Sequence, residues 1–444
     1  MNTVHVSVDP SVSNPLPMRN ILGMNNQPTI QVKKRYQLQK DWFAALKLRH
    51  LRHHDAALAD PGLDLIDVNR IFPLFHLDEN DPKNYRFEQT DDYLSCITDL
   101  DLEIDFRLGE SIDHSGFARY IQPPKDPGKW ARICRNIVAH YKNGENNGMH
   151  LNITRVTVWE EADNSVLFAG TVEQYSALYC AVYKLFHKEF PGIQVGGPTV
   201  MSNGYEFMDG FLRICKENSI IPDFVTITHY TRNLNTIPDS VRKLRSMLDG
   251  YGFFSTRVIV SEWHLGPTGW QGNLRDIDAQ GFTKTTSAAF AASTLIRLLD
   301  IEYLDAAFFY AWGNGPVWAA FTQYPDMFRR PSYFGLLFFN QMAVECRKRL
   351  SVQWDGAENI SVLSGQTEDG KVRLLISCYE TDATAFTCNV KGAVSCTMKV
   401  IRNNYCENDC TEGIDIAVDT DGTVTFAQES DGSDVFLLEF SLAE

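Results

Sequence analysis

Eight short runs rich in β-branched and aromatic residues recur along the first 350 residues of the chain, and longer amphipathic stretches separate most of them. One such stretch, residues 171–192, has apolar residues at three- and four-residue spacing and ends at a Pro-Gly pair, which is the pattern of an amphipathic helix. Strand and helix repeated eight times predict an α/β fold with parallel strands and right-handed crossovers, and favour a (β/α)8 TIM barrel. The runs are NILGM (20–24), LRHLRHH (48–54), LEIDFRL (102–108), ITRVTVW (153–159), IQVGG (193–197), DFVTITHY (223–230), RVIVSEW (257–263) and DAAFFYAW (305–312).

The alternative arrangement of such elements is a doubly wound open sheet. A nucleotide-binding sheet of that kind carries a glycine-rich phosphate loop after its first strand. No such loop follows residues 20–24, so the closed barrel is the favoured prediction.

The pattern changes near residue 350. From there to residue 444, short alternating strands are broken by Gly, Asp and Asn, and no helical period is visible. This spacing is typical of a small antiparallel β-sandwich. The opening run VHVSVD (4–9) alternates in the same way. We therefore expect a barrel over residues 15–349 and an accessory β-sandwich over 350–444, which a strand from residues 1–14 joins.

The charge balance limits the classes of partner. The chain has 444 residues, with 56 Asp and Glu against 41 Lys and Arg, and a net charge of −15. An acidic excess argues against binding to nucleic acid or to an anionic membrane surface. No window approaches a membrane span, and the N-terminus shows no signal peptide. These features predict a cytoplasmic protein, with a trimmed secreted chain as the alternative, and they make no prediction of its oligomeric state.

Two glutamates fall where a barrel of this kind would carry its active site. Active sites of such barrels lie at the C-terminal ends of the strands, where Glu161 follows the fourth run and Glu262 lies in the seventh. The two are 101 residues apart, which fits three βα units of about 33 residues. One carboxyl group can protonate a leaving oxygen while the other attacks the anomeric carbon of a sugar. The pair therefore predicts a glycoside hydrolase with a carbohydrate substrate.

Polar and aromatic residues at the same strand ends are candidates for binding the sugar. Aromatic rings can stack on sugar faces, and a nearby Arg and His can fix hydroxyl groups and keep a nucleophilic carboxylate ionised. Consecutive residues such as His53, His54 and Asp55 cannot all point at one ion, so we do not expect a metal site. The reaction of two carboxyl groups with a glycoside needs no organic cofactor either. The candidates are Arg52, His54, Glu160, His229, Tyr230, Trp263, Tyr310 and Trp312.

Six segments in order resemble glycoside hydrolase family 39, a retaining family that includes β-xylosidases and α-L-iduronidases. The resemblance covers roughly residues 15–345 and implies a (β/α)8 barrel, commonly with an accessory β-sandwich. It further implies that Glu161 is the acid/base, that Glu262 is the nucleophile, and that Tyr230 lies near the nucleophile. LRHHD resembles the family's Arg-x-His segment and so implies that Arg52 and His54 lie in the pocket. The six segments are TVWEEAD, FAGTVEQYSALY, FPGIQVGGPT, DFVTITHY, VIVSEWH and RRPSYFGLLFFNQM.

Two positions depart from the family pattern. Glu160 stands where the family has an asparagine that hydrogen-bonds the sugar 2-hydroxyl, and an ionised carboxylate cannot donate that bond. Thr228 stands at the position of a family histidine, with His229 one place later on the opposite side of the strand. The resemblance implies an exo-acting retaining hydrolase of a xyloside or related sugar. The departures favour a non-standard sugar, and the alternatives are a non-catalytic carbohydrate-binding barrel or an endo-acting glycosidase.

Overall fold

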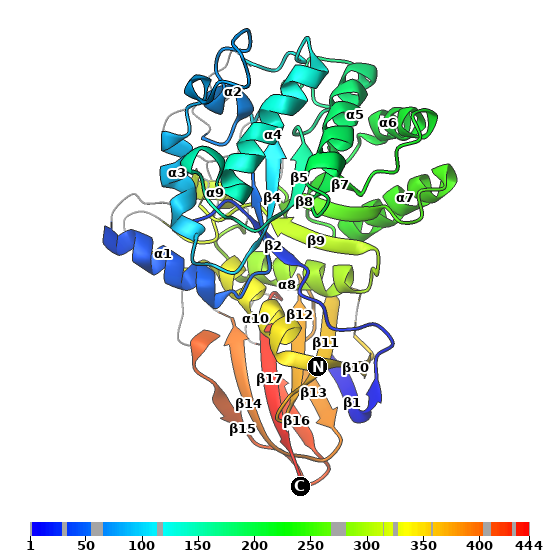
Figure 1. Ribbon diagram of the computed structural model, residues 1–444. Helices are drawn as coiled ribbons and strands as arrows, with labels where there is room; N and C mark the ends of the chain where they lie inside the picture. The colour runs from blue at the N-terminus through cyan, green and yellow to red at the C-terminus, as the bar shows by residue number, and fades with distance from the viewer. Residues whose placement is uncertain are drawn as a thin grey trace.

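A closed barrel of eight parallel strands forms one half of the molecule (Figure 1). The computed structural model describes residues 2–28, 33–54, 65–112, 119–267, 281–313, 315–322, 327–356, 358–402, 410–428 and 432–443. Each barrel strand overlaps one of the eight runs identified in the sequence, and β2 pairs with β9 to close the ring. The predicted (β/α)8 barrel is therefore confirmed. Its strands are β2 (Leu22–Asn25), β3 (His50–His53), β4 (Glu103–Leu108), β5 (Ile153–Val158), β6 (Gln194–Val200), β7 (Phe224–Thr231), β8 (Arg257–Leu265) and β9 (Leu304–Phe309).

Helices surround the barrel strands (Figure 1). The helix expected within residues 171–192 forms as α5 (Val172–Glu189), and its first turn is closed by reciprocal hydrogen bonds between Thr171 and Gln174. This capping box satisfies backbone N–H groups that have no partner inside the helix. The other helices are α1 (Lys33–Ala45), α2 (Val68–Ile71), α3 (Glu88–Leu94), α4 (Pro127–Asn143), α6 (Tyr205–Glu217), α7 (Thr236–Tyr251), α8 (Thr285–Leu299), α9 (Gly315–Trp318) and α10 (Pro331–Glu345).

A second sheet of nine strands forms the other half of the molecule. Its order is β15-β14-β17-β12-β11-β10-β1-β13-β16, and its pairs are antiparallel apart from β1 with β13. The N-terminal strand lies inside this sheet, between β10 and β13, and β10 begins at Cys346. The strands are β1 (Thr3–Ser13), β10 (Cys346–Trp354), β11 (Ile360–Thr367), β12 (Val372–Cys378), β13 (Ala385–Val390), β14 (Ala393–Ile401), β15 (Ile414–Ile416), β16 (Thr423–Ala427) and β17 (Val435–Leu442).

This sheet curls over a core of its own. Phe386 of β13 and Phe436 of β17 belong to strands that are far apart in the sheet order, yet their ring centroids lie 5.6 Å apart. Val4, Val6 and Val8 of β1 are buried in the same cluster. Residues from distant strands that meet in this way give a two-layered body, as in a β-sandwich. The predicted accessory β-rich body is therefore present.

Helix α8 joins the two halves because it lies between the barrel and the nine-stranded sheet (Figure 1). Thirteen of its 15 residues are buried, so it lacks the polar face that a surface helix carries. Ser377 of β12 donates a 2.9 Å hydrogen bond to the carbonyl oxygen of Ala289 in this helix. The small residues of SAAFAAS thus let the sheet approach the helix closely.

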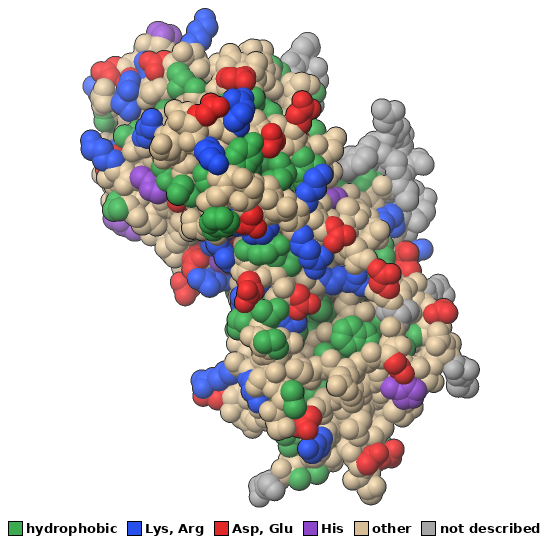
Figure 2. Space-filling view, turned by 90° about the vertical axis from the view of Figure 1, so that its right-hand side faces the viewer, with side chains coloured by type: hydrophobic (Ala, Val, Ile, Leu, Met, Phe, Trp, Pro, Cys, Tyr) green, Lys and Arg blue, Asp and Glu red, His purple; other side chains and the backbone are tan. Residues whose placement is uncertain are grey.

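Figure 2 shows the barrel above and the nine-stranded sheet below, joined by a narrower region, with cationic and anionic side chains interspersed over this face. The acidic excess of the chain therefore does not gather into one patch on the side shown. In the part of the chain that the structure describes, no helix is long and apolar enough to cross a membrane.

Candidate active site

The turn after β5 brings two consecutive glutamates to the same end of the barrel. In a straight strand, Glu160 and Glu161 would point to opposite faces. The chain instead turns at Trp159 and Glu161, whose φ angles of 63° and 34° lie in the left-handed region that non-glycine residues seldom adopt. As a result Glu160 contacts Arg52 of β3, while Glu161 contacts Thr228 of β7. Glu160 and Glu161 thus each contact a side chain of another strand at the C-terminal end of the barrel.

Arg52 holds the centre of the site. Its side chain is fully buried, and its Nη1 donates a 3.0 Å hydrogen bond to Oδ1 of Asn25 on β2. Its Nη2 contacts Oε2 of Glu160 directly, whereas its Nη1 lies 3.4 Å from Oε1 of Glu262. The guanidinium group therefore lies closer to Glu160 than to Glu262 and stabilises the charge of Glu160 more strongly.

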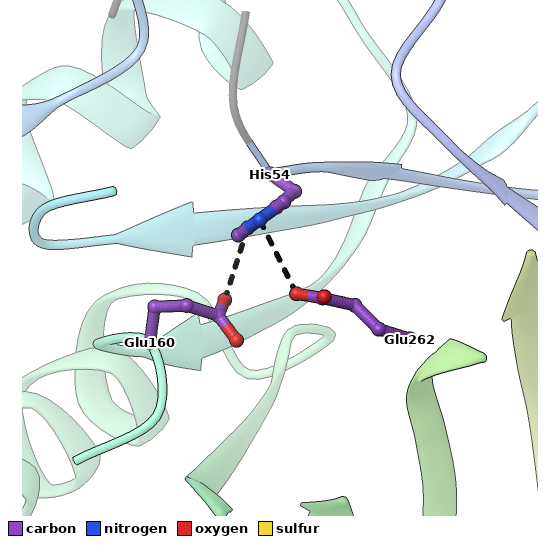
Figure 3. Close-up of side chains that lie close together, drawn as sticks. All are labelled: His54, Glu160 and Glu262. Carbon is purple, nitrogen blue, oxygen red and sulfur yellow. Dashed lines mark ion pairs between the residues drawn. The ribbon is translucent and has the colours of Figure 1, made fainter. Parts of the chain in front are cut away.

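His54 lies between the same two glutamates, as Figure 3 shows. Its Nδ1 is 3.2 Å from Oε2 of Glu160, and its Nε2 is 3.2 Å from Oε1 of Glu262. All three side chains are buried. The imidazole ring and the guanidinium group of Arg52 thus each bridge the two carboxyl groups.

The two bridged carboxyl groups have opposite pKa shifts. Burial raises the pKa of Glu160, but the charges of Arg52 and His54 outweigh it and bring that pKa down to about 2. Burial and the charge of Glu160 raise the pKa of Glu262 to about 8, against the opposing effects of His54 and Arg52. Since the two groups share their partners, they titrate as one coupled system. Glu160 is the more acidic member and Glu262 the less acidic one.

Glu161 is a half-buried carboxyl group whose two oxygens accept hydrogen bonds from neutral donors. Thr228 Oγ1 donates a 2.7 Å hydrogen bond to its Oε1, and Asn164 Nδ2 donates a 3.0 Å hydrogen bond to its Oε2. Burial, followed by the charge of Glu160, raises the pKa of Glu161. A carboxyl group with a raised pKa keeps its proton to a higher pH, which suits a general acid.

Aromatic side chains lie beside Glu262. Tyr230 on β7 donates a 2.6 Å hydrogen bond from its hydroxyl group to Oε2 of Glu262. The ring of Tyr310, just after β9, lies 5.5 Å from that of His54 and 6.0 Å from that of Tyr230. The ring of Trp318 packs edge-on against both tyrosines. These rings supply the apolar side of the site.

Three residues predicted to bind the sugar lie away from this cluster, and the prediction for them is corrected. Nε2 of His229 lies 3.1 Å from Oγ of Ser240 in α7, so its ring faces the helix layer. Trp263 is fully buried against Phe290 of α8. His229 and Trp263 point outward because each is next to a residue that points inward. Trp312 is buried too, and its ring packs against α1 and against the 315–322 segment.

The site also contains a set of possible metal ligands. His54, Glu160 and Glu262 each offer a ligand atom within 4.8 Å of the other two. The guanidinium group of Arg52 already contacts both carboxyl groups. A divalent ion would add positive charge where a fixed cation lies, which weakens its binding. The donor set therefore suits a proton better than a metal ion.

Sequence reasoning missed three residues of the site. Asn25 orients Arg52, and Thr228 and Asn164 hold the two carboxyl oxygens of Glu161. Thr228 could have been found, because it lies two positions before Tyr230 and therefore on the same face of the strand. Asn164 lies in an irregular turn, where side-chain direction has no sequence period to follow.

A closed parallel barrel with paired carboxyl groups on the ends of its strands is the architecture of the barrel glycoside hydrolases. Residues 27–246 match the family described as glycosyl hydrolases family 39. A β-xylosidase from Geobacillus stearothermophilus is 26% identical over 212 residues, which span 44% of this chain and 40% of that enzyme. Residues 27–246 of the chain therefore match glycoside hydrolase family 39, and the resemblance predicted from the sequence is confirmed.

Solved structures share the architecture over the full length. A glucosidase from Croceicoccus marinus has a TM-score of 0.77 at 20% identity, with 100% of both chains covered. A monomeric β-xylosidase from Caulobacter crescentus has a TM-score of 0.71 at 15% identity, covering 99% of this chain and 100% of that one. At these identities the likeness establishes the fold, including the accessory sheet.

Proposed function

We propose that the protein is a retaining, exo-acting glycoside hydrolase of a xyloside or a related sugar. Glu161 is the acid/base and Glu262 is the nucleophile. The observation that carries the proposal is the difference between their surroundings. Glu161 is held by neutral donors, whereas Glu262 contacts Arg52 and accepts a hydrogen bond from Tyr230. Two carboxyl groups in unlike environments are what divided acid and nucleophile roles require.

The first step forms a glycosyl–enzyme ester. A carboxylate oxygen of Glu262 bonds to the anomeric carbon as the bond from that carbon to the leaving oxygen breaks. The proton on Glu161 moves to the leaving oxygen, so the aglycone departs as a neutral alcohol. Tyr230 fixes the direction of the Glu262 carboxylate through its hydrogen bond to Oε2.

The second step reverses the roles at the anomeric carbon. Glu161, now ionised, takes a proton from a water molecule, and the water oxygen bonds to the anomeric carbon. The ester bond to Glu262 breaks, and its electron pair returns to the carboxylate. The sugar leaves with its original anomeric configuration, and both glutamates regain their starting states.

The substrate class rests on relatives. Two similar proteins are β-xylosidases, while another is a glucosidase. A xyloside lacks the exocyclic carbon of a glucoside, so these substrates differ by one substituent on the ring. We therefore assign a pyranoside of the xylose or glucose type as the first class to test.

A panel of chromogenic aryl glycosides tests the proposed activity. We expect turnover of at least one of them by the wild-type protein and its loss in Glu262→Gln. The matched control is Glu206→Gln, which makes the same change at an exposed position of α6 and should leave turnover intact. Equal turnover by the wild type and Glu262→Gln would refute the proposed nucleophile.

A second candidate function is sugar binding without hydrolysis. It is favoured by one observation, the direct contact of Arg52 with Glu160 in place of a closer contact with Glu262. A protein of that kind would bind the sugars of the panel with measurable affinity and turn over none of the glycosides. Product analysis on oligosaccharides separates exo action, which releases single units, from endo action.

A further inference from the structure

Two carboxyl groups face the two nitrogens of one imidazole ring in the site. Nδ1 of His54 lies 3.2 Å from Glu160, and Nε2 lies 3.2 Å from Glu262 (Figure 3). A neutral imidazole has an N–H on one nitrogen and a lone pair on the other. With both glutamates ionised, that lone pair would face an anionic oxygen in a buried site, where such repulsion is poorly screened.

This repulsion is removed when His54 and the two glutamates together hold one extra proton. The proton can lie on His54, whose positive charge then lies between the two carboxylates, or on Glu262, which then donates to Nε2. Glu160 is the poorer host, because Arg52 contacts it directly. Its Oε1 is buried and has no hydrogen-bond partner among the described residues. The charge of Glu160 therefore stays in place and retains the proton nearby.

We propose that Glu160 is a positioning residue which, through Arg52 and His54, makes the His54–Glu262 pair hold one proton in the free protein. Since Glu262 can attack a sugar only as a carboxylate, the first chemical step requires this proton either to lie on His54 or to have left the pair. The inference rests on the proposed function of Glu262 as the nucleophile. By this inference Glu160 determines the pH at which the nucleophile is ionised.

Burial is the largest cause of the raised pKa of Glu262, and the charge of Glu161 adds to that of Glu160. Tyr230 donates a neutral hydrogen bond to it. The carboxyl group of Glu161 is held by Thr228 and Asn164 and is not a partner of His54. The raised pKa of Glu262 agrees with a retained proton. The charged and titratable groups around Glu262 are Arg52 and His54 from β3 and its end, Asp105 from β4 acting on Arg52, Glu160 and Glu161 after β5, Tyr230 from β7 and Tyr310 after β9.

Replacing Glu160 by glutamine removes the negative charge that favours a proton on the His54–Glu262 pair. The amide can donate to Nδ1 of His54, which leaves a neutral imidazole free to donate from Nε2 to an ionised Glu262. Arg52 would then have Glu262 as its only close carboxylate in this cluster. The pair should release its proton at a lower pH in this variant.

The test follows the pair directly by NMR of the full chain, with ¹³C in the glutamate carboxyl groups and ¹⁵N in the histidine rings. Glu262→Gln and His54→Asn assign the two signals. In the wild type we expect one proton on the pair at pH 7. In Glu160→Gln we expect the midpoint of its release to fall by at least about one pH unit, since one unit corresponds to a modest change in interaction between charges.

Two outcomes would overturn the inference. One is a wild-type protein in which His54 is neutral and Glu262 is ionised at pH 7, a measurement that does not depend on the folding of any Glu160 variant. The other is an unchanged midpoint in folded Glu160→Gln. Glu103→Gln is the matched control, because Glu103 lies 3.5 Å from His50 at the opposite end of β3, and it should leave the midpoint unchanged.

The NMR result separates this inference from the proposed activity. If no glycoside is turned over but the pair holds its proton, the proposed function fails and the inference about the proton stands. Where turnover is found, kcat/KM against pH gives a second readout. The whole profile should move toward acid in Glu160→Gln, because Glu160 raises the pKa of both Glu161 and Glu262. Metal-dependent turnover lost on chelation would show instead that a metal ion occupies this cluster, and would overturn the inference.

Discussion

Tyr230 and Glu262 are joined by a 2.6 Å hydrogen bond between the phenol hydroxyl group and Oε2. The two residues lie on adjacent strands, β7 and β8, so their backbones fix the approach of the two groups. A half-buried tyrosine with its hydroxyl group aimed at one carboxylate oxygen leaves the other oxygen to Arg52 and His54. The proposed nucleophile is thus held from both sides.

Tyr230→Phe should lower kcat/KM without unfolding the protein. A hydrogen bond to a charged group contributes about 1.5–3 kcal/mol, which corresponds to a loss of roughly 10- to 100-fold. Steady-state kinetics on the best aryl glycoside measure it. Tyr251→Phe serves as the control, because its hydroxyl group donates a 2.9 Å hydrogen bond to Asp209 at the surface. Unaltered kinetics in Tyr230→Phe would show that the bond does not orient Glu262.

Glu161→Gln should have an effect that depends on the leaving group. A general acid contributes about 10²- to 10⁴-fold to the rate when the leaving oxygen needs a proton. We therefore expect a loss of that size for an alkyl glycoside, and a much smaller loss in the first step for a dinitrophenyl glycoside. Rates of aglycone release across a leaving-group series measure this. A uniform loss across the series would argue against Glu161 as the acid.

The raised pKa of Glu262 predicts how stability changes with pH. Burial and the charge of Glu160 raise the pKa of Glu262 from its usual 4.5 to about 8 in the folded protein. A carboxyl group with a raised folded pKa stabilises the fold fully below its unfolded pKa and loses that contribution as pH rises through the folded value. Glu262→Gln cannot ionise, so its stability relative to the wild type should increase between pH 5 and pH 9.

Denaturant unfolding at several pH values measures that difference. The expected change is on the order of a few kcal/mol, since one pKa unit corresponds to about 1.4 kcal/mol. Glu206→Gln, at an exposed position, should give a flat difference over the same range. A flat difference for Glu262→Gln as well would mean that Glu262 is ionised in the folded protein at neutral pH.

The barrel could be predicted from the sequence because buried parallel strands are short, nearly continuous apolar runs. Glu161 and Glu262 could be placed at the strand ends for the same reason. The inward position of both Glu160 and Glu161 could not be predicted, because it depends on positive φ angles at Trp159 and Glu161. Neither residue is a glycine or an asparagine, which would have marked such a turn.

Two other features could not be predicted from the sequence, each for a different reason. Trp263 is a large aromatic residue next to Glu262, and its residue type suggested sugar stacking, whereas the strand alternation directs it toward α8. The insertion of β1 between β10 and β13 pairs residues that are far apart in the sequence, such as Val6 with Trp354. No local pattern specifies a pairing over that separation.

We propose that residues 15–349 and 350–444 are the two domains, and that the N-terminal strand ties the first residues to the second domain. Val6→Asp tests this, because Val6 is buried in the sheet core while its neighbour Ser7 is exposed. We expect Val6→Asp to destabilise the protein by at least about 3 kcal/mol through an unpaired buried charge. Ser7→Asp should be nearly neutral in thermal unfolding, and an equally small effect of both would contradict the role of β1.

Covalent trapping of the nucleophile tests the central claim most directly. The protein is incubated with an activated 2-deoxy-2-fluoro analogue of the sugar that it turns over, and the labelled peptide is sequenced by mass spectrometry. We predict that a single fluoroglycosyl group is attached to Glu262, with label formation slowed in Tyr230→Phe. A label on Glu160 or Glu161, or turnover that inverts the anomeric configuration without any covalent intermediate, would contradict the account.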